Sequence, residues 1–85
     1  MSFKQFHKYG GYTAPRSVSP DDLNVWSKAL ALPGTGAKLA AKGEPTSVQT
    51  AVASGRKFKF AFKDGSTVVV WQSWRNVISI LNHEA

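Results

Sequence analysis

The sequence predicts an α+β domain in which helices pack on one face of a small antiparallel sheet. Residues 20–31 carry apolar side chains at helical spacing, whereas residues 46–72 alternate with a period of two and contain an Asp-Gly hairpin signal. At 85 residues the chain has room for one domain. We expect the order helix, short helix, three-stranded antiparallel meander and C-terminal helix, with residues 1–16 as an arm and residues 17–85 as the domain.

The first helix is expected over residues 20–31. Ser19 is suited to cap its first turn and Pro20 to occupy its first position, while the two aspartates that follow complement the positive end of the helix dipole. A Pro-Gly pair ends this helix, and residues 36–42 are expected to add a turn or two of a second one. The side chains of the first helix that are expected to pack on the sheet are Leu23, Trp26 and Leu30.

Three strands are expected over residues 46–72, where apolar and polar side chains alternate. The Asp-Gly pair at 64–65 lies between two β-rich runs and suits a two-residue type I′ loop, which needs a positive φ at both positions. In the register that such a loop imposes, Phe58 faces Trp71 on the neighbouring strand.

This register divides the side chains of the sheet between two faces. One face is rich in phenylalanine, and we expect it to be the core because the helices need an apolar surface on which to pack. The other face carries lysines at alternate positions and is expected to point to solvent. The core face is expected to hold Phe58, Phe60, Phe62, Val69 and Trp71. The outer face is expected to hold Lys57, Lys59, Ala61, Lys63, Val68 and Val70.

Residues 74–83 are expected to form the C-terminal helix, which would start after a Ser73 cap. Four apolar residues follow at i, i+3, i+4 and i+7, the spacing of one helical face. They would pack on the same sheet face as the first helix. These residues are Trp74, Val77, Ile78 and Leu81.

The arm is both basic and aromatic. Its four aromatic residues recur at every third position, and Gly10-Gly11 and Pro15 argue against one continuous helix. We expect the arm either to dock on the domain or to order when a partner arrives.

Positive charge is concentrated in the arm and in the middle of the chain. The net charge is +6, and residues 36–63 hold six cations against one carboxylate, a net +5. A concentrated basic patch attracts polyanions, including nucleic acid. The alternative is that these lysines keep a small domain soluble or protect the sheet from edge pairing.

These features favour a small, basic, non-catalytic module that binds DNA or RNA, preferably single-stranded, through the phosphate backbone. The basic sheet face and the arm together would form the nucleic-acid interface. The residues assigned to nucleic-acid binding are Lys4, Lys8, Lys38, Lys42, Arg56, Lys57, Lys59 and Lys63. The residues assigned to base stacking or partner contact are Phe3, Phe6, Tyr9 and Tyr12.

A protein partner is the second interpretation. A compact chain with an arm that can order on contact suits a modulator or inhibitor of another protein, of the kind that phages encode. Its basic face would then meet an acidic protein surface.

Other classes of function find little support in the sequence. The chain has no cysteine, and its two histidines lie near opposite ends, so we expect neither a metal site nor a cofactor, and no catalytic residues. It has no secretory signal and no apolar run of membrane-spanning length, so a cytoplasmic protein is expected.

Overall fold

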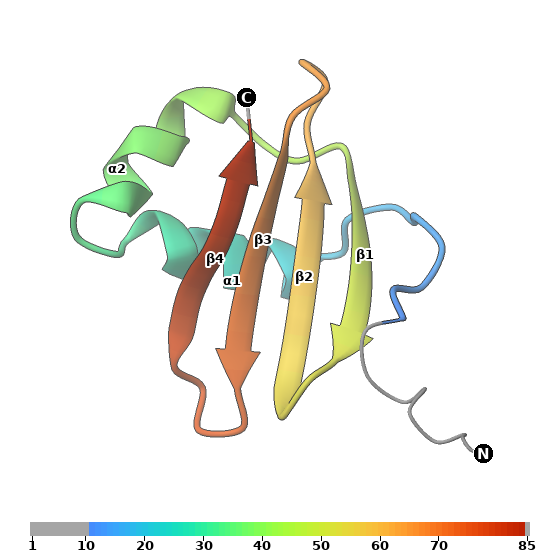
Figure 1. Cartoon of the computed structure of the whole chain (residues 1–85). Coiled ribbons are helices and arrows are strands. Elements are labelled where there is room, and N and C mark those ends of the chain that lie inside the picture. Colours follow the sequence, from blue (N-terminus) through green and yellow to red (C-terminus); the bar gives the residue numbers. More distant parts are fainter. Residues whose placement is uncertain (1–10, 85) are drawn as a thin grey trace.

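The computed structural model describes residues 11–84, which form two short helices and a four-stranded antiparallel sheet in the order β1-β2-β3-β4. Both helices lie on the same side of the sheet, with α1 crossing behind the strands (Figure 1). No helix in this range has the length and apolar character needed to cross a membrane. The elements are α1 (Pro20–Leu30), α2 (Thr35–Leu39), the 3-10 turn η2 (Ala40–Lys42), β1 (Ser47–Val52), β2 (Gly55–Ala61), β3 (Thr67–Ser73) and β4 (Ile78–Glu84).

The start of α1 confirms the sequence prediction. Ser19 adopts an extended backbone and forms a capping box with Asp22, while Pro20 occupies the first helical position. The backbone N–H of Asp22 donates to Ser19 Oγ, and the backbone N–H of Ser19 donates to the carboxylate of Asp22. These reciprocal bonds fix the point at which the chain enters the helix.

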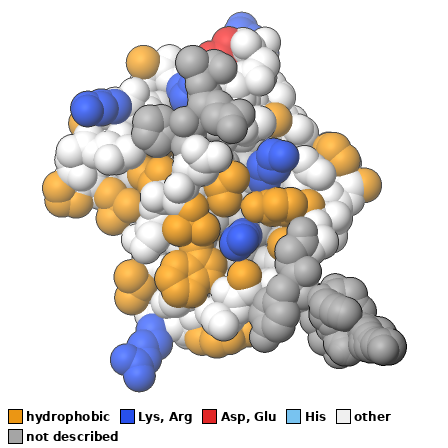
Figure 2. Space-filling model, viewed as in Figure 1, with side chains coloured by type: hydrophobic (Ala, Val, Ile, Leu, Met, Phe, Trp, Pro, Cys, Tyr) orange, Lys and Arg blue, Asp and Glu red, His pale blue; other side chains and the backbone are white. Residues whose placement is uncertain are grey.

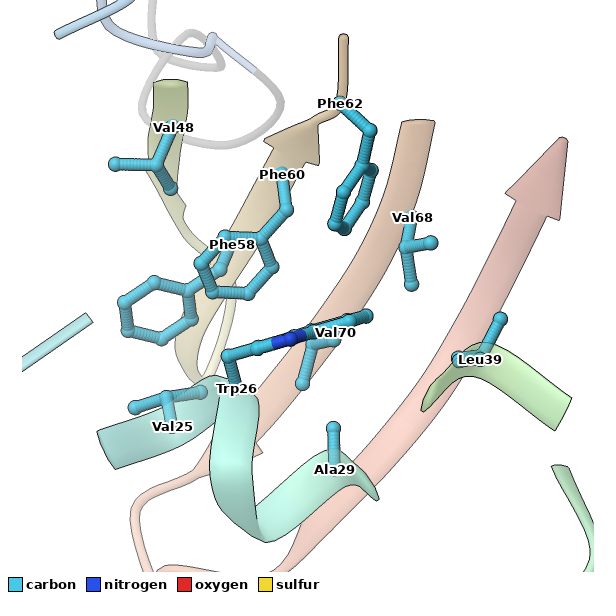
Figure 3. Packing of buried hydrophobic residues seen from close by; sticks show 10 residues of the cluster. All are labelled: Val25, Trp26, Ala29, Leu39, Val48, Phe58, Phe60, Phe62, Val68 and Val70. Carbon is cyan, nitrogen blue, oxygen red and sulfur yellow. The ribbon is translucent and has the colours of Figure 1, made fainter. Parts of the chain in front are cut away.

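The core lies between α1 and the phenylalanine-rich face of the sheet, as predicted (Figure 3). The ring of Trp26 lies 5.3 Å from that of Phe60 and 5.1 Å from that of Phe62, both in tilted geometry. Such aromatic pairs contribute about 1 kcal/mol beyond the apolar area that they bury. The buried hydrophobic cluster consists of Val25, Trp26, Ala29, Leu39, Val48, Phe58, Phe60, Phe62, Val68 and Val70.

The loop between β2 and β3 is longer than the predicted two residues. The backbone N–H of Phe62 donates to the carbonyl of Ser66 at 3.0 Å, and that of Gly65 donates to the carbonyl of Phe62 at 3.0 Å. Gly65 has φ 88°, the left-handed region that glycine enters at little cost. The hairpin therefore has a three-residue loop with glycine at the left-handed position, the next most common arrangement after the two-residue loop.

The extra loop residue shifts the β2–β3 register by one, so the predicted pairing was wrong. Phe58 faces Val70, and Lys57 faces Trp71. A shift of one residue moves every side chain of a strand to the opposite face. Val68 and Val70 are therefore buried in the core, whereas Val69 and Trp71 lie on the lysine side of the sheet.

The predicted C-terminal helix is also wrong, because these residues form β4. Trp74 and Val77 are 73% and 57% exposed instead of buried, and they flank a tight turn. The backbone N–H of Ser73 donates to the carbonyl of Val77, and Asn76 has φ 64°. Ser73 does act as a cap, but its Oγ accepts the backbone N–H groups of this turn rather than those of a helix.

Two features of the sequence explain why a strand forms here. Ile78 and Ile80 alternate with Ser79 and are β-branched, which suits a pleated surface. Both isoleucines pack against the core from the β4 side. Because β4 also pairs with β3, it supplies backbone hydrogen bonds to a strand that would otherwise form the edge of the sheet.

Substitution of Asn76 tests this turn. Asn76→Gly should leave the free energy of unfolding within about 0.5 kcal/mol of wild type, because glycine adopts a positive φ freely. Asn76→Val should cost about 1–2 kcal/mol, because a β-branched residue is strained there. Urea unfolding followed by fluorescence measures both values. The opposite order, with glycine the more harmful, would indicate a helix over residues 74–83.

Candidate functional site

The candidate site is the sheet face that no described helix covers, which we call the open face. Its residues form three rows across the sheet, as the strand pairing requires: two that hold the lysines, and a third at the positions of Ser47, Ala61, Thr67 and Glu84. Figure 2 shows Lys or Arg side chains set among hydrophobic side chains over the middle of this face. One lysine row contains Ala51, Lys57, Trp71 and Ser79. The other lysine row contains Gln49, Lys59, Val69 and Asn82.

Lys57 and Lys59 both come from β2 at the centre of this face. Each is half-buried. Lysines at such positions commonly bury their aliphatic stems and keep their amines in water. The Nζ of Lys59 lies 5.6 Å from the ring centre of Tyr12, within the range of a cation–π contact. Among the side chains that the structure describes, neither lysine has a carboxylate within 4.0 Å. The ion pairs between described side chains join other residues. Their charges are therefore not neutralised by a described neighbour.

Trp71 lies in the same row as Lys57 and is partly exposed. Its indole N–H donates to the carbonyl of Ala53 at 2.8 Å, in the turn between β1 and β2. The indole therefore extends from β3 over the start of β2 to the turn between β1 and β2. The backbones come close together here, since a Cβ on Gly55 would collide with the carbonyl oxygen of Gln72.

Sequence reasoning missed Trp71 because it assigned the residue to the core. The error follows directly from the predicted two-residue loop. The available signal was the alternative hairpin loop of three residues ending in glycine, Lys63-Asp64-Gly65, which Phe62 and Ser66 close.

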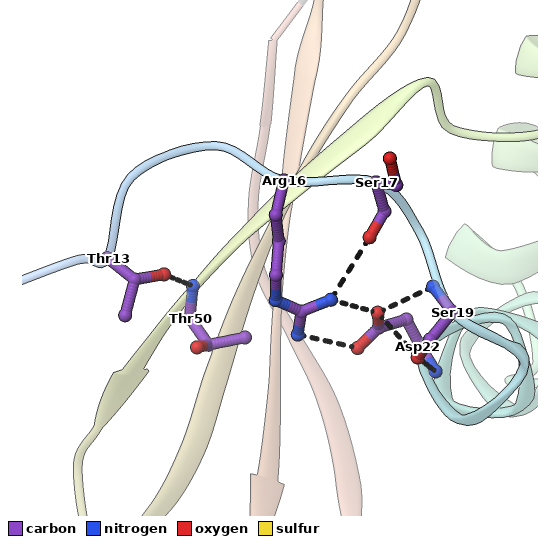
Figure 4. A network of polar contacts seen from close by, with 6 residues as sticks. All are labelled: Thr13, Arg16, Ser17, Ser19, Asp22 and Thr50. Carbon is purple, nitrogen blue, oxygen red and sulfur yellow. Dashed lines mark hydrogen bonds and ion pairs between the residues drawn. The ribbon is translucent and has the colours of Figure 1, made fainter.

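The described part of the arm runs along the outer edge of β1. The backbone N–H of Thr13 donates to the carbonyl of Thr50 at 2.8 Å, and Arg16 exchanges two backbone hydrogen bonds of 3.0 Å with Val48. The side-chain hydroxyl of Thr13 also accepts the backbone N–H of Thr50 (Figure 4). These bonds hold Tyr12 beside Lys59, and burial raises the pKa of the Tyr12 hydroxyl above its ordinary value.

An ion pair links this edge segment to α1. Arg16 donates to both carboxylate oxygens of Asp22, at 2.6 and 3.2 Å, while Ser19 donates to the same carboxylate through its backbone N–H and its hydroxyl (Figure 4). Asp22 is buried, with 3% of its surface exposed. The hydrogen bonds from Arg16, followed by those from Ser19, lower the pKa of Asp22 from 3.8 to about 2. The same hydrogen bond, which Arg16 donates to Asp22, raises the pKa of Arg16.

The structure does not gather all of the predicted cations on the open face. Lys63 is exposed at the tip of the β2–β3 hairpin, and Lys38 is exposed on α2. Arg56 lies on the helix side, beside a shallow cavity of about 200 Å³ that residues of α1 also line. The predicted residues that lie outside the described part of the chain are Lys4, Lys8, Phe3, Phe6 and Tyr9.

Lys42 is held away from the open face by a buried contact. Its Nζ donates to Ser66 Oγ at 2.7 Å, and Ser66 Oγ donates in turn to the carboxylate of Asp64 at 2.6 Å. A serine beside a lysine amine is a known nucleophile–base pair. Here Ser66 is only 1% exposed and its proton is directed to Asp64, so a substrate has no access to the hydroxyl. These contacts instead join η2 to the β2–β3 hairpin, and the bonds from Ser66 lower the pKa of Asp64.

The described residues contain no group of three or more His, Cys, Asp or Glu side chains placed to hold a metal ion. Comparisons of the chain with protein-family models, with curated proteins and with solved structures found no match. The geometry of the open face is therefore the feature of this molecule from which a function can be inferred.

The Arg16–Asp22 pair predicts a specific loss of stability in acid. Because the folded-state pKa of Asp22 is about 2, below its ordinary 3.8, its ionised form stabilises the fold by about 2 kcal/mol above pH 4. That contribution should disappear as the pH falls from 4 through 2. Denaturant unfolding at pH 5 and at pH 2.5 measures it.

Asp22→Asn should lower stability at pH 5 and should remove this part of the pH dependence. The matched control is Asp21→Asn, the neighbouring carboxylate on α1, which is exposed and leaves the contact with Arg16 in place. If both variants keep the pH dependence of the wild type, Asp22 is not its source.

Proposed function

We propose that this protein is a non-catalytic nucleic-acid-binding module whose open face contacts the phosphate backbone of a single strand. The observation that carries the proposal is the placement of Lys57 and Lys59 side by side on the open face without a described carboxylate partner. The excess of cations over the whole chain, +6, would attract the same ligand from a distance.

The spacing of the two lysines suits an extended polyanion. Residues two apart on a strand lie about 7 Å from each other along it, so their amines can contact successive phosphates of a strand that follows β2. Because both lysines are half-buried, their side chains have less conformational freedom to lose than fully exposed ones. This reduces the loss of side-chain entropy when a ligand binds.

The shape of the open face favours a single strand over duplex DNA. Four strands span about 14 Å between the outer backbones, whereas the major groove is about 12 Å wide and admits one helix or a two-stranded ribbon. The open face therefore cannot enter a groove as a whole. An extended strand with unpaired bases can lie flat across it.

Protein binding remains a second candidate because of a different part of the molecule. Trp74 and Val77 are exposed at the β3–β4 turn, and Leu81 is 50% exposed on β4. Within the described chain, β4 pairs only with β3, whereas the opposite edge of the sheet is lined by residues 13–16. A free edge with exposed apolar side chains can accept a strand of a partner protein.

The double substitution Lys57→Gln/Lys59→Gln tests the nucleic-acid proposal. It should weaken binding to a single-stranded oligonucleotide at least ten-fold at low salt. It should also reduce the slope of log affinity against log salt by about 1.4, because each lost phosphate contact removes about 0.7. Fluorescence anisotropy over a salt series measures both quantities.

The matched control is Lys28→Gln/Lys38→Gln, which removes the same charge from exposed positions on α1 and α2. This control should lower the affinity much less than the open-face variant. Equal effects of the two variants would mean that net charge, and not the open face, determines binding. If the wild type binds no oligonucleotide at low salt, the proposal fails, and the apolar surface around Trp74 becomes the site to test.

A further inference from the structure

We infer that Trp71 is a base-stacking residue of the open face, so that the ligand is a stretch of unpaired nucleotides recognised through its bases as well as its phosphates. This inference rests on the proposed function and makes it more specific. Lysines alone would bind any polyanion, whereas a stacking residue requires exposed bases.

The position of Trp71 supports this role. Trp71 is directly opposite Lys57 in the β2–β3 register, and Lys59 lies in the adjacent row beside Val69. Side chains directly opposite on neighbouring strands have Cβ atoms about 5 Å apart. One nucleotide can therefore place its phosphate at the amine of Lys57 and its base at the indole of Trp71.

The orientation of the indole is fixed before a ligand arrives. Its only hydrogen-bond donor is already used on the carbonyl of Ala53 at 2.8 Å. With this donor occupied, the indole can offer a base an apolar π surface but no free polar group. Such a surface stacks with any base, and a ring already held in place loses little conformational entropy on binding.

The two other tryptophans do not meet these conditions. Trp26 is 3% exposed and packs between Phe60 and Phe62 in the core. Trp74 is 73% exposed, but it lies in the turn between β3 and β4 rather than in any row of the open face. Trp74 therefore provides a control with the same chemistry and greater exposure.

The first test compares oligonucleotides of equal length and charge that have or lack bases. The probes are oligo(dT), oligo(rU) and an abasic deoxyribose-phosphate strand, all measured by anisotropy against the wild-type protein. We expect the abasic strand to bind about ten-fold or more weakly than oligo(dT) at the same salt concentration.

The second test compares Trp71→Leu with the control Trp74→Leu. Trp71→Leu should weaken binding of the base-containing strands about ten-fold and leave binding of the abasic strand nearly unchanged. Trp74→Leu should change neither. Trp71→Phe, which keeps an aromatic ring but loses the bond to Ala53, should fall between Trp71→Leu and the wild type.

The outcomes separate this inference from the proposed function. If the wild type binds intact and abasic strands equally, with a steep salt dependence, Trp71 is not a stacking residue but the lysine interface stands. If it binds none of the probes, both fail. The comparison of probes uses the wild-type protein, so it decides the question even if Trp71→Leu does not fold.

Discussion

The register of β2 against β3 determines which side chains form the core and which form the open face. Phe62 and Ser66 close the hairpin loop, and Gly65 takes the left-handed conformation that this loop length requires. With one residue fewer in the loop, Val68 and Val70 would exchange faces with Val69 and Trp71. Both the packing beneath α1 and the surface offered to a ligand therefore depend on one turn.

The two faces of the sheet carry different kinds of side chain, although they belong to the same strands. On one face, Trp26 packs against Phe60 and Phe62, which a chain of this size needs because small domains bury a limited fraction of their surface. On the other face, Lys57 and Lys59 contribute charge without entering that core. Changes on the open face can therefore alter the charge of that surface with little effect on the packing that maintains the fold.

The sequence predicted those elements that depend on local signals. The cap at Ser19, the start of α1, the short second helix, the three strands and the phenylalanine core are all present. The register was missed because the Asp-Gly pair fits loops of two and of three residues, and the choice is made by the packing of both strands. The last element was missed because four apolar residues happened to follow helical spacing. Alternation at Ile78 and Ile80, together with pairing to β3, outweighed that pattern.

The candidate site was predicted in part for the same reasons. The alternation of lysines along β2 is a local pattern, so their common face could be read directly from the sequence. The position of Trp71 depends on the partner strand, and no pattern within β3 alone reveals it. Tertiary packing places Arg56, Lys38 and Lys42 away from the open face, on the helix side. A count of charges along the sequence cannot predict this placement.

The pairing of residues 13–16 with β1 also limits how this sheet can grow. Sheets with two bare edges can add copies in both directions and so build filaments. In the described chain the β1 edge is lined by residues 13–16, a short segment in which Pro15 has no N–H to offer a further strand, so the seven-residue β4 is the more complete edge. Two copies that paired through β4 alone would form a closed, two-fold symmetric pair.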